Sequence, residues 1–158
     1  MRLMLIPLLI GLSSCIPKQE RKEMVLTASR LAYTDEFLGV QFISNYDGDT
    51  LMVELPGLPR VFGHHISVRV KHVDTPEMMS SDPCARAVAA EGREKVGALL
   101  RTAKTIDLIN VDRDKYFRIL AEVRINGTLM LHEFLIDNRL AIPYEGDQKS
   151  KINWCPQQ

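Results

Sequence analysis

The sequence has no excess of charge, few cysteines and no long apolar segment, and each absence excludes a class of protein. Its 158 residues carry 20 lysines and arginines against 20 aspartates and glutamates, so the formal net charge is zero. A strong general binder of nucleic acid carries a basic footprint, which this composition lacks. If the ligand is a polyanion, the attraction must be local to one cleft.

Metal-binding cysteine motifs are also missing. The 3 cysteines, Cys15, Cys84 and Cys155, form no Cys-x-x-Cys pair, and no paired-histidine spacing accompanies them. This pattern disfavours a zinc site. No internal repeat or low-complexity tract is present, and the length predicts one domain with a real core.

The first residues have the pattern of a secretory signal. Arg2 gives a short basic start, and an apolar run follows over Leu3–Leu12. That run is too short for a permanent membrane-spanning helix, which needs about 20 residues. Leu12-Ser13-Ser14-Cys15 then has the form of a bacterial lipobox. We therefore predict a signal peptide over residues 1–14 and lipidation of Cys15, with ordinary cleavage nearby as the alternative.

A lipid on Cys15 would hold the exported protein on the bacterial cell envelope, on the periplasmic side or at the surface. Ile16 follows the cysteine where an aspartate would signal retention, which favours the outer membrane in a host with two membranes. Residues 15–36 are mixed and polar and predict a tether. Residues 37–158 predict the folded domain.

Two cysteines remain if the first is acylated, and disulfides persist outside the cytoplasm. We therefore predict a disulfide between Cys84 and Cys155. It would close a loop of about 70 residues and contribute roughly 4 kcal/mol in the chain-entropy model. Two unpaired buried thiols are the alternative.

Hydrophobic periodicity predicts strands on both sides of one long helix. Asp82 followed by Pro83 is a typical helix start, and apolar residues at helical spacing continue to Thr102. A short helix over 129–138 and a last helical turn over 149–155 are also predicted. Alternating apolar residues predict five strands, at 39–44, 50–55, 66–73, 106–111 and 117–125. The pattern indicates a small α+β fold with a curled sheet.

Four short stretches near the strand ends combine carboxylates with arginines. They supply oxygens for a hard metal ion, a spare carboxylate to act as a base, and two guanidinium groups. One stretch alone would indicate a turn, but four with matching chemistry make the set that cleavage of a phosphodiester requires. In chain order they are Asp47-Gly48-Asp49-Thr50, Arg69, Asp74-Thr75-Pro76-Glu77 and Asp114-Lys115-Tyr116-Phe117-Arg118.

The order and spacing of these stretches resemble the staphylococcal (micrococcal) nuclease family, also called thermonuclease-like. The resemblance runs from about Phe42 to Tyr144. Its sharpest part is the segment from Arg69 to Glu77, which has the family's Arg-x4-Asp-Thr-Pro-Glu form. The resemblance implies a five-stranded OB-type β-barrel with about three helices.

Asp49 and Asp74 are the predicted metal ligands. Both stand at turns beside strands, and ligation by oxygen alone suits Ca²⁺ rather than zinc or copper. The family pattern adds the backbone carbonyl of Thr75 as a third protein ligand. Either aspartate taken alone would be interpreted as a turn residue.

Glu77 is the predicted general base, because by resemblance it occupies the family's water-activating position. Arg69 and Arg118 are predicted to clamp the phosphate, since guanidinium forks match phosphate oxygens in a way that lysine does not. Lys115 and Tyr116 match the family's Asp-Lys-Tyr-x-Arg turn, which implies contact with the terminal phosphate. In isolation, Glu77 would be interpreted as a solvent-exposed loop glutamate, and Arg69 and Arg118 as partners in surface salt bridges.

The sequence departs from the family pattern at two places. Phe117 stands where the best-known members have glycine, which makes the approach to Arg118 bulkier. The connection over residues 55–66 is longer than in the staphylococcal enzyme and contains His64 and His65. Adjacent side chains rarely chelate one ion, so we interpret this histidine pair as part of an exposed loop.

The sequence therefore predicts a Ca²⁺-dependent phosphodiesterase that hydrolyses DNA, RNA or both with low sequence specificity. The resemblance implies products with 3′-phosphates. A non-catalytic nucleic-acid-binding OB module on the cell envelope is the alternative, and a structural envelope lipoprotein is a third. We predict no protein partner and a monomer. Tyr144 lies near a family tyrosine that stacks on bases, but it is left outside the predicted site.

Overall fold

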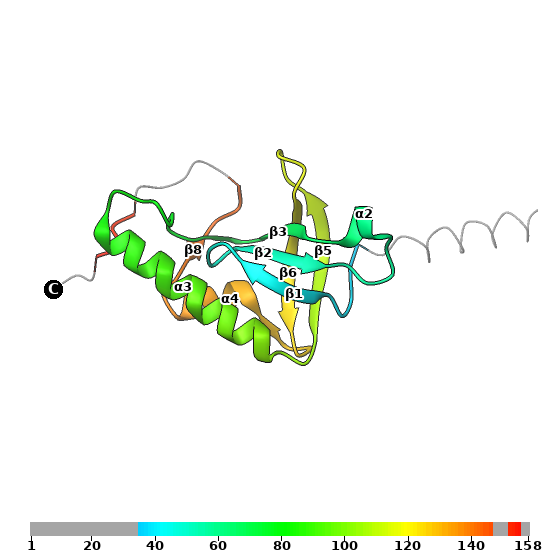
Figure 1. The fold of residues 1–158 in the computed structure, drawn as a ribbon. Coiled ribbons are helices and arrows are strands. Elements are labelled where there is room, and N and C mark those ends of the chain that lie inside the picture. Colours follow the sequence, from blue (N-terminus) through cyan, green and yellow to red (C-terminus); the bar gives the residue numbers. More distant parts are fainter. Residues whose placement is uncertain (1–34, 147–151, 156–158) are drawn as a thin grey trace, which may run out of the picture. The chain divides into compact units, whose positions relative to one another are not determined.

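The structure, a computed structural model, describes residues 35–146 and 152–155 (Figure 1). The predicted signal peptide, Cys15 and most of the predicted tether lie outside the described residues. No described helix is both long and apolar enough to cross a membrane.

A curled sheet forms the centre of the domain. Its strands lie in the order β1-β2-β3-β6-β5, with β3 and β6 parallel, the other neighbours antiparallel, and β7 paired with β6. The bounds are β1 Gln41–Asn45, β2 Thr50–Glu54, β3 Ile66–Val70, β5 Ile106–Arg113, β6 Ile119–Ile125 and β7 Leu129–Met130.

The segment before β1 pairs with β5, the strand at the other end of the sheet order. The backbone N–H of Val40 donates to the carbonyl of Ile106 at 2.8 Å, and Phe37 pairs with Leu108. The two ends of the five-strand order are thereby joined, as closure of a small barrel requires. The prediction of an OB-type α+β fold is confirmed.

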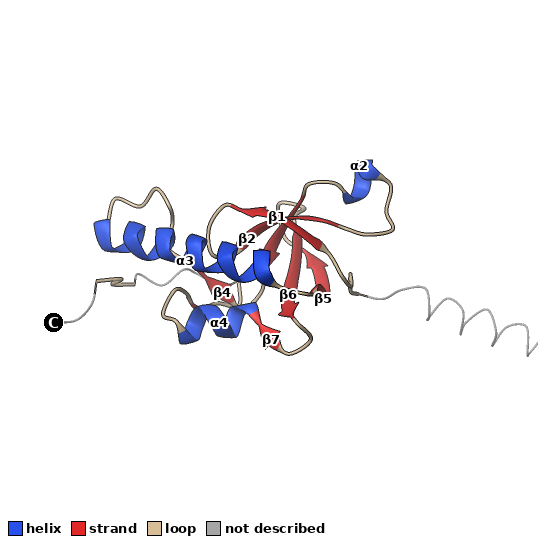
Figure 2. Cartoon of the chain, turned by 60° about the horizontal axis from the view of Figure 1, so that its bottom comes forward, coloured by secondary structure: helices blue, strands red, loops and turns tan. Residues whose placement is uncertain are grey.

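Helices cover the sheet and complete the core. α3 (Pro83–Thr102) packs against β1, and α4 (Leu131–Asp137) lies next to β6, β7 and the short strand β4 (Val73–Asp74) (Figure 2). α3 begins as predicted, because the Asp82 side chain accepts a hydrogen bond from the backbone N–H of Cys84 at 2.9 Å. The helix turns its small and apolar residues inward: Ala85, Ala89, Gly92, Val96, Gly97 and Leu100.

The third strand is shorter than predicted. It ends at Val70, and His72 adopts a φ of 66°, which breaks the extended backbone. The chain then forms β4 (Val73–Asp74), which pairs with β8 (Ile142–Pro143) in a separate two-stranded sheet. The long connection before β3 also contains a single helical turn, α2 (Arg60–Gly63), where we predicted only a loop.

The described part of the predicted helical turn over 149–155 is not helical. Residues 147–151 lie outside the described part, and residues 152–155 form no helix. Cys155 is instead joined to Cys84 by a disulfide, with 5.1 Å between the two Cα atoms. The predicted disulfide is therefore present, and it fastens residue 155 to the first turn of α3.

Candidate active site

The turn between β1 and β2 is built around the carboxylate of Asp47. This carboxylate accepts hydrogen bonds from the backbone N–H of Asp49 at 3.0 Å and of Thr50 at 2.7 Å. Such a bond from an aspartate to the backbone two residues on closes a tight turn. Asp47 thus forms the turn, and Asp49 lies next to it in the same cleft.

Gly48 permits this turn to lie against the loop that follows β4. A Cβ atom at Gly48 would come within 2.9 Å of Cγ2 of Thr75 and 3.3 Å of Cδ2 of Leu135. Both contacts are tighter than ordinary van der Waals separations. The glycine is therefore required for close approach.

Asn45, which was not among the predicted site residues, links this turn to α3. The Asn45 side chain donates to the carbonyls of Asp47 and Arg93, both at 2.8 Å. Gly97 leaves room for this amide, since a Cβ there would lie 2.9 Å from Oδ1 of Asn45. No local signal reveals this link, because Arg93 is 48 residues further along the chain.

Asp49 joins the two loops that carry the predicted metal ligands. Its side chain is 1% exposed, and Oδ2 accepts hydrogen bonds from the backbone N–H and the hydroxyl of Thr75, at 2.8 and 2.7 Å. Oδ1 forms an ion pair with Arg69, whose Nη2 lies 3.0 Å from Oδ1 of Asp74. One guanidinium group therefore contacts both predicted ligand carboxylates.

Three carboxylates in this region are buried, and Arg69 contacts two of them. Asp47, Asp49 and Asp74 are all buried, at 9%, 1% and 8% exposure. Burial raises the pKa of Asp47, although hydrogen bonds from Thr50 and the charge of Arg69 oppose the rise. Buried carboxylates need compensating charge, so the donor set fits a hard divalent cation. Asp49, Asp74 and the Thr75 carbonyl offer oxygen atoms only, as Ca²⁺ prefers.

The hairpin between β5 and β6 orients Arg118. The Asp114 carboxylate accepts from Nε of Arg118 at 2.7 Å and from the backbone N–H groups of Arg118 and Tyr116 at 2.9 and 2.8 Å. Burial alone would raise the pKa of Asp114, but these hydrogen bonds outweigh it and lower that pKa. The ion pair engages Nε of Arg118. The two terminal nitrogens can therefore still bind two phosphate oxygens at once.

Phe117 adopts a φ of 64°, in the left-handed region that favours glycine. Glycine, which the resemblance implies at this position, would adopt this conformation at a lower cost than phenylalanine. The ring is 80% exposed and lines a neighbouring cavity of about 240 Å³ instead of the main cleft. The added bulk therefore lies beside Arg118, outside the pocket that contains the predicted ligands.

All of the predicted catalytic, metal-binding and substrate-binding residues line one cleft of about 620 Å³. β3 supplies Arg69, the loop after β4 supplies Glu77, and the β5–β6 hairpin supplies Arg118. Glu77 is exposed, and its loop is fixed in part by the N–H of Ser80, which donates to the Glu77 carbonyl at 3.1 Å. The predicted residues in the cleft are Asp49, Arg69, Asp74, Thr75, Glu77, Lys115, Tyr116 and Arg118.

Two further tyrosines line the same cleft. Tyr46 follows β1 and is 61% exposed, and we did not predict a role for it. Tyr144, which the sequence left outside the predicted site, lies on the cleft wall, where its backbone N–H donates to the His72 carbonyl at 3.0 Å. Two aromatic faces beside the acidic and basic groups suit stacking on nucleic-acid bases.

Comparison with known proteins agrees with this geometry. No curated protein matches the chain. The family model for staphylococcal nuclease homologues matches residues 67–154, which is more than half of the chain and includes Arg69, Glu77 and Arg118. The chain therefore belongs to the staphylococcal nuclease family.

Proposed function

We propose that this protein is a Ca²⁺-dependent phosphodiesterase that cleaves DNA, RNA or both with low sequence preference and leaves 3′-phosphates. The supporting observation is that buried carboxylates, an exposed glutamate and two arginines converge on one open cleft in a chain of a nuclease family. An open cleft suits a long polymeric substrate, and contacts to phosphate alone carry no sequence information.

Asp49, Asp74 and the Thr75 carbonyl would hold the ion in this proposal. When bound, Ca²⁺ offsets the charge that builds up on a phosphate oxygen during the reaction. The hydrogen bonds from Thr75 to Asp49 keep both ligand loops together.

Glu77 takes a proton from the water that attacks phosphorus, the bond from phosphorus to the 5′-oxygen breaks, and that oxygen takes a proton from solvent as it leaves. Arg69 and Arg118 bind the remaining phosphate oxygens and stabilise their charge. Asp114 acts as a positioning residue, because its bond to Nε of Arg118 fixes the direction of that side chain. Tyr46 and Tyr144 offer surfaces for the flanking bases.

Digestion of plasmid DNA and of RNA, each with Ca²⁺ and with a chelator, tests the proposal. We expect cleavage only with Ca²⁺. Glu77→Gln should lower turnover at least about 100-fold, as expected for loss of a positioned base, with no loss of folding. Glu91→Gln is the matched control, since Glu91 lies on the exposed face of α3 and pairs with Lys95 at 2.8 Å.

Unchanged turnover in Glu77→Gln would remove Glu77 as the base. Retardation of DNA without cutting, in the presence of Ca²⁺, would support a non-catalytic binding module instead. Neither cutting nor retardation would support a structural role.

We also propose that a lipid on Cys15 anchors the protein to the cell envelope, on the strength of the lipobox pattern. Expression of wild type and Cys15→Ser with a labelled fatty acid tests this assignment. Label on the wild type alone, together with release of Cys15→Ser from the membrane fraction, is the expected result. Equal membrane association of the two proteins would contradict it.

A further inference from the structure

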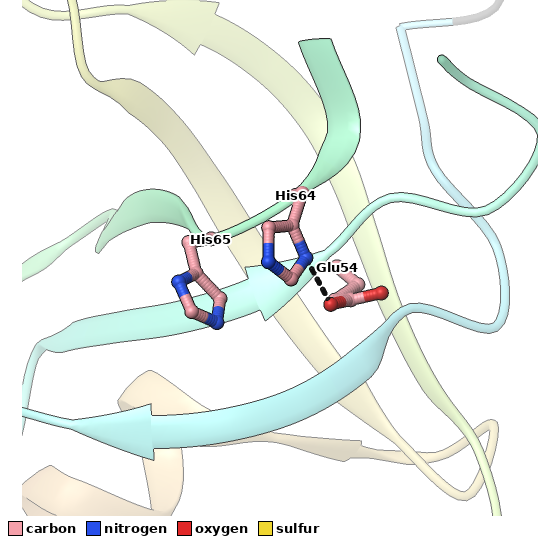
Figure 3. Close-up of side chains that lie close together, drawn as sticks. All are labelled: Glu54, His64 and His65. Carbon is pink, nitrogen blue, oxygen red and sulfur yellow. Dashed lines mark hydrogen bonds and ion pairs between the residues drawn. The ribbon is translucent and has the colours of Figure 1, made fainter. Parts of the chain in front are cut away.

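A second group of ligating side chains lies outside the cleft. In the β2–β3 ladder, Thr50 pairs with Arg69 at the cleft end and Val53 pairs with Ile66 near the opposite end. Glu54, the last residue of β2, lies beside His64 and His65 at that opposite end (Figure 3). One ligand atom from each of these three side chains lies within 4.8 Å of the other two.

The backbone brings two adjacent imidazoles to the same side. In an extended strand neighbouring side chains point to opposite faces, but His65 adopts a φ of 54°. The His64 and His65 rings therefore stack, with 3.9 Å between centroids and 19° between planes. Nδ1 of His64 contacts Oε1 of Glu54 directly. The sequence interpreted this pair as part of an exposed loop, and the structure adds that the two rings lie on the same side of the backbone.

The loop that carries the histidines is fastened to β2. The backbone N–H of Leu55 donates to the carbonyl of Gly63 at 2.8 Å, and that of His64 donates to the carbonyl of Arg60 at 3.0 Å. A Cβ atom at Gly63 would lie 2.8 Å from the Leu55 carbonyl oxygen, so the loop packs tightly at this point. The fixed backbone holds the three side chains together before any ligand arrives.

We propose that Glu54, His64 and His65 bind a divalent transition-metal ion, with Zn²⁺ as the best match. Two imidazoles and a carboxylate are ligands that zinc accepts, with water in the fourth position. Bonds of about 2.0–2.1 Å in a tetrahedron place ligand atoms about 3.3 Å apart. Binding therefore requires the His64 and His65 rings to rotate out of their stack, because the in-plane lone pairs of two nearly parallel rings do not meet at one ion.

The ligand chemistry separates this site from the cleft. The cleft offers oxygen donors, which suit hard ions, whereas imidazole nitrogens select borderline ions such as Zn²⁺. Arg60 lies 3.4 Å from Nε2 of His64 and is exposed, so it can swing away when the ion binds. The inference does not depend on the proposed nuclease activity.

Another histidine provides a matched control. His72 also contacts carboxylates, with Nδ1 2.9 Å from Glu145 and Nε2 3.4 Å from Glu122. In the part of the chain that the structure describes, however, His72 belongs to no group of three converging ligand atoms. The Asp82, Cys84 and Cys155 group has its sulfurs in the disulfide and is not a candidate.

Zn²⁺ titration against a chromogenic chelator tests the site, in the Cys15→Ser protein so that no thiol outside the disulfide contributes. Excess Ca²⁺ in the buffer occupies oxygen-only sites. We expect one Zn²⁺ per chain, and Co²⁺ in its place should show the visible absorption of a tetrahedral ion.

Glu54→Gln and His65→Ala should each weaken Zn²⁺ binding at least about tenfold, since even loss of an outer-shell partner commonly costs that much. His72→Ala should bind as the wild type does. Metal-free thermal unfolding confirms that each variant is folded. The proposal is overturned if the wild type binds no Zn²⁺ at micromolar concentrations, if both cluster variants bind as tightly as wild type, or if His72→Ala is weakened equally.

Discussion

Replacement of Arg69 by methionine should destabilise the metal-free protein strongly. The side chain is 16% exposed, and it contacts the buried carboxylates of Asp49 and Asp74. Removing one partner from a buried ion pair costs about 3–5 kcal/mol, because the other charge stays buried and uncompensated. For a domain of this size about 1 kcal/mol corresponds to roughly 4 °C in Tm. We therefore expect a fall of about 12–20 °C in the presence of a chelator.

Addition of Ca²⁺ should reduce the difference in Tm between the wild type and Arg69→Met. In the proposed site the guanidinium and the ion share the carboxylates of Asp49 and Asp74, so the variant lacks a competitor for the ion and gains more stability from it. Thermal unfolding followed by circular dichroism, over a series of Ca²⁺ concentrations, measures both this difference and its reduction. The nuclease assay is not needed for this readout.

Arg124→Met is the control for a less buried ion pair. Arg124 contacts Asp107 at 3.1 Å and its side chain is 31% exposed. Its loss should cost no more than about 1 kcal/mol, and Ca²⁺ should not alter that cost. The reasoning fails if Arg69→Met and the wild type have the same Tm in chelator, or if Ca²⁺ leaves the difference between their Tm values unchanged.

Three smaller perturbations test the surroundings of the cleft. Gly48→Ala should cost about 1–3 kcal/mol and lower the Ca²⁺ affinity, because the new Cβ would lie 2.9 Å from Cγ2 of Thr75; an unchanged Tm would show that the loop yields freely. Phe117→Gly should raise stability by up to about 1 kcal/mol, since a positive φ is costly for any other residue and the exposed ring makes few contacts; a lower Tm would contradict this. Hydrogen bonding to Glu145 raises the pKa of His72 above its ordinary value of 6.5, with burial opposing. The stabilisation is therefore fully present below pH 6.5 and is lost as the pH rises through the folded-state pKa. Glu145→Gln should lower the Tm at pH 5.5 more than at pH 9, and an equal loss at both would exclude the titration.

Local signals were sufficient where a structure is set by residues close in sequence. Asp82 and Pro83 predicted the start of α3 because the cap and the first helical residue are neighbours. The stretch Asp47-Gly48-Asp49-Thr50 indicated a turn for the same reason. The end of β3 was missed, because the positive φ of His72 is not encoded by any glycine.

Long-range contacts explain the residues that the sequence did not reveal. Asn45 links the turn to α3 through a carbonyl 48 residues away, and a strand-end asparagine carries no sign of such a partner. The stacking of His64 on His65 depends on one backbone angle, so adjacent histidines looked unsuited to share a ligand. The cleft residues were identified through the family motif. Periodicity alone could not show that residues from separate strands and loops meet in one cleft.

The composition suggested that any attraction for a polyanion comes from charges local to the cleft. The side chains that line the cleft, however, carry more negative than positive charges, so they do not supply that attraction by themselves. Among its described lining residues, the cations are Arg69, Lys115 and Arg118, and they face five carboxylates. The carboxylates are Asp47, Asp49, Asp74, Glu77 and Asp114. Without a bound cation this surface is negative overall and repels phosphate. In the proposed mechanism, affinity for the substrate and occupancy by the ion are therefore one coupled equilibrium, which accounts for how a chain of zero net charge can act on nucleic acid.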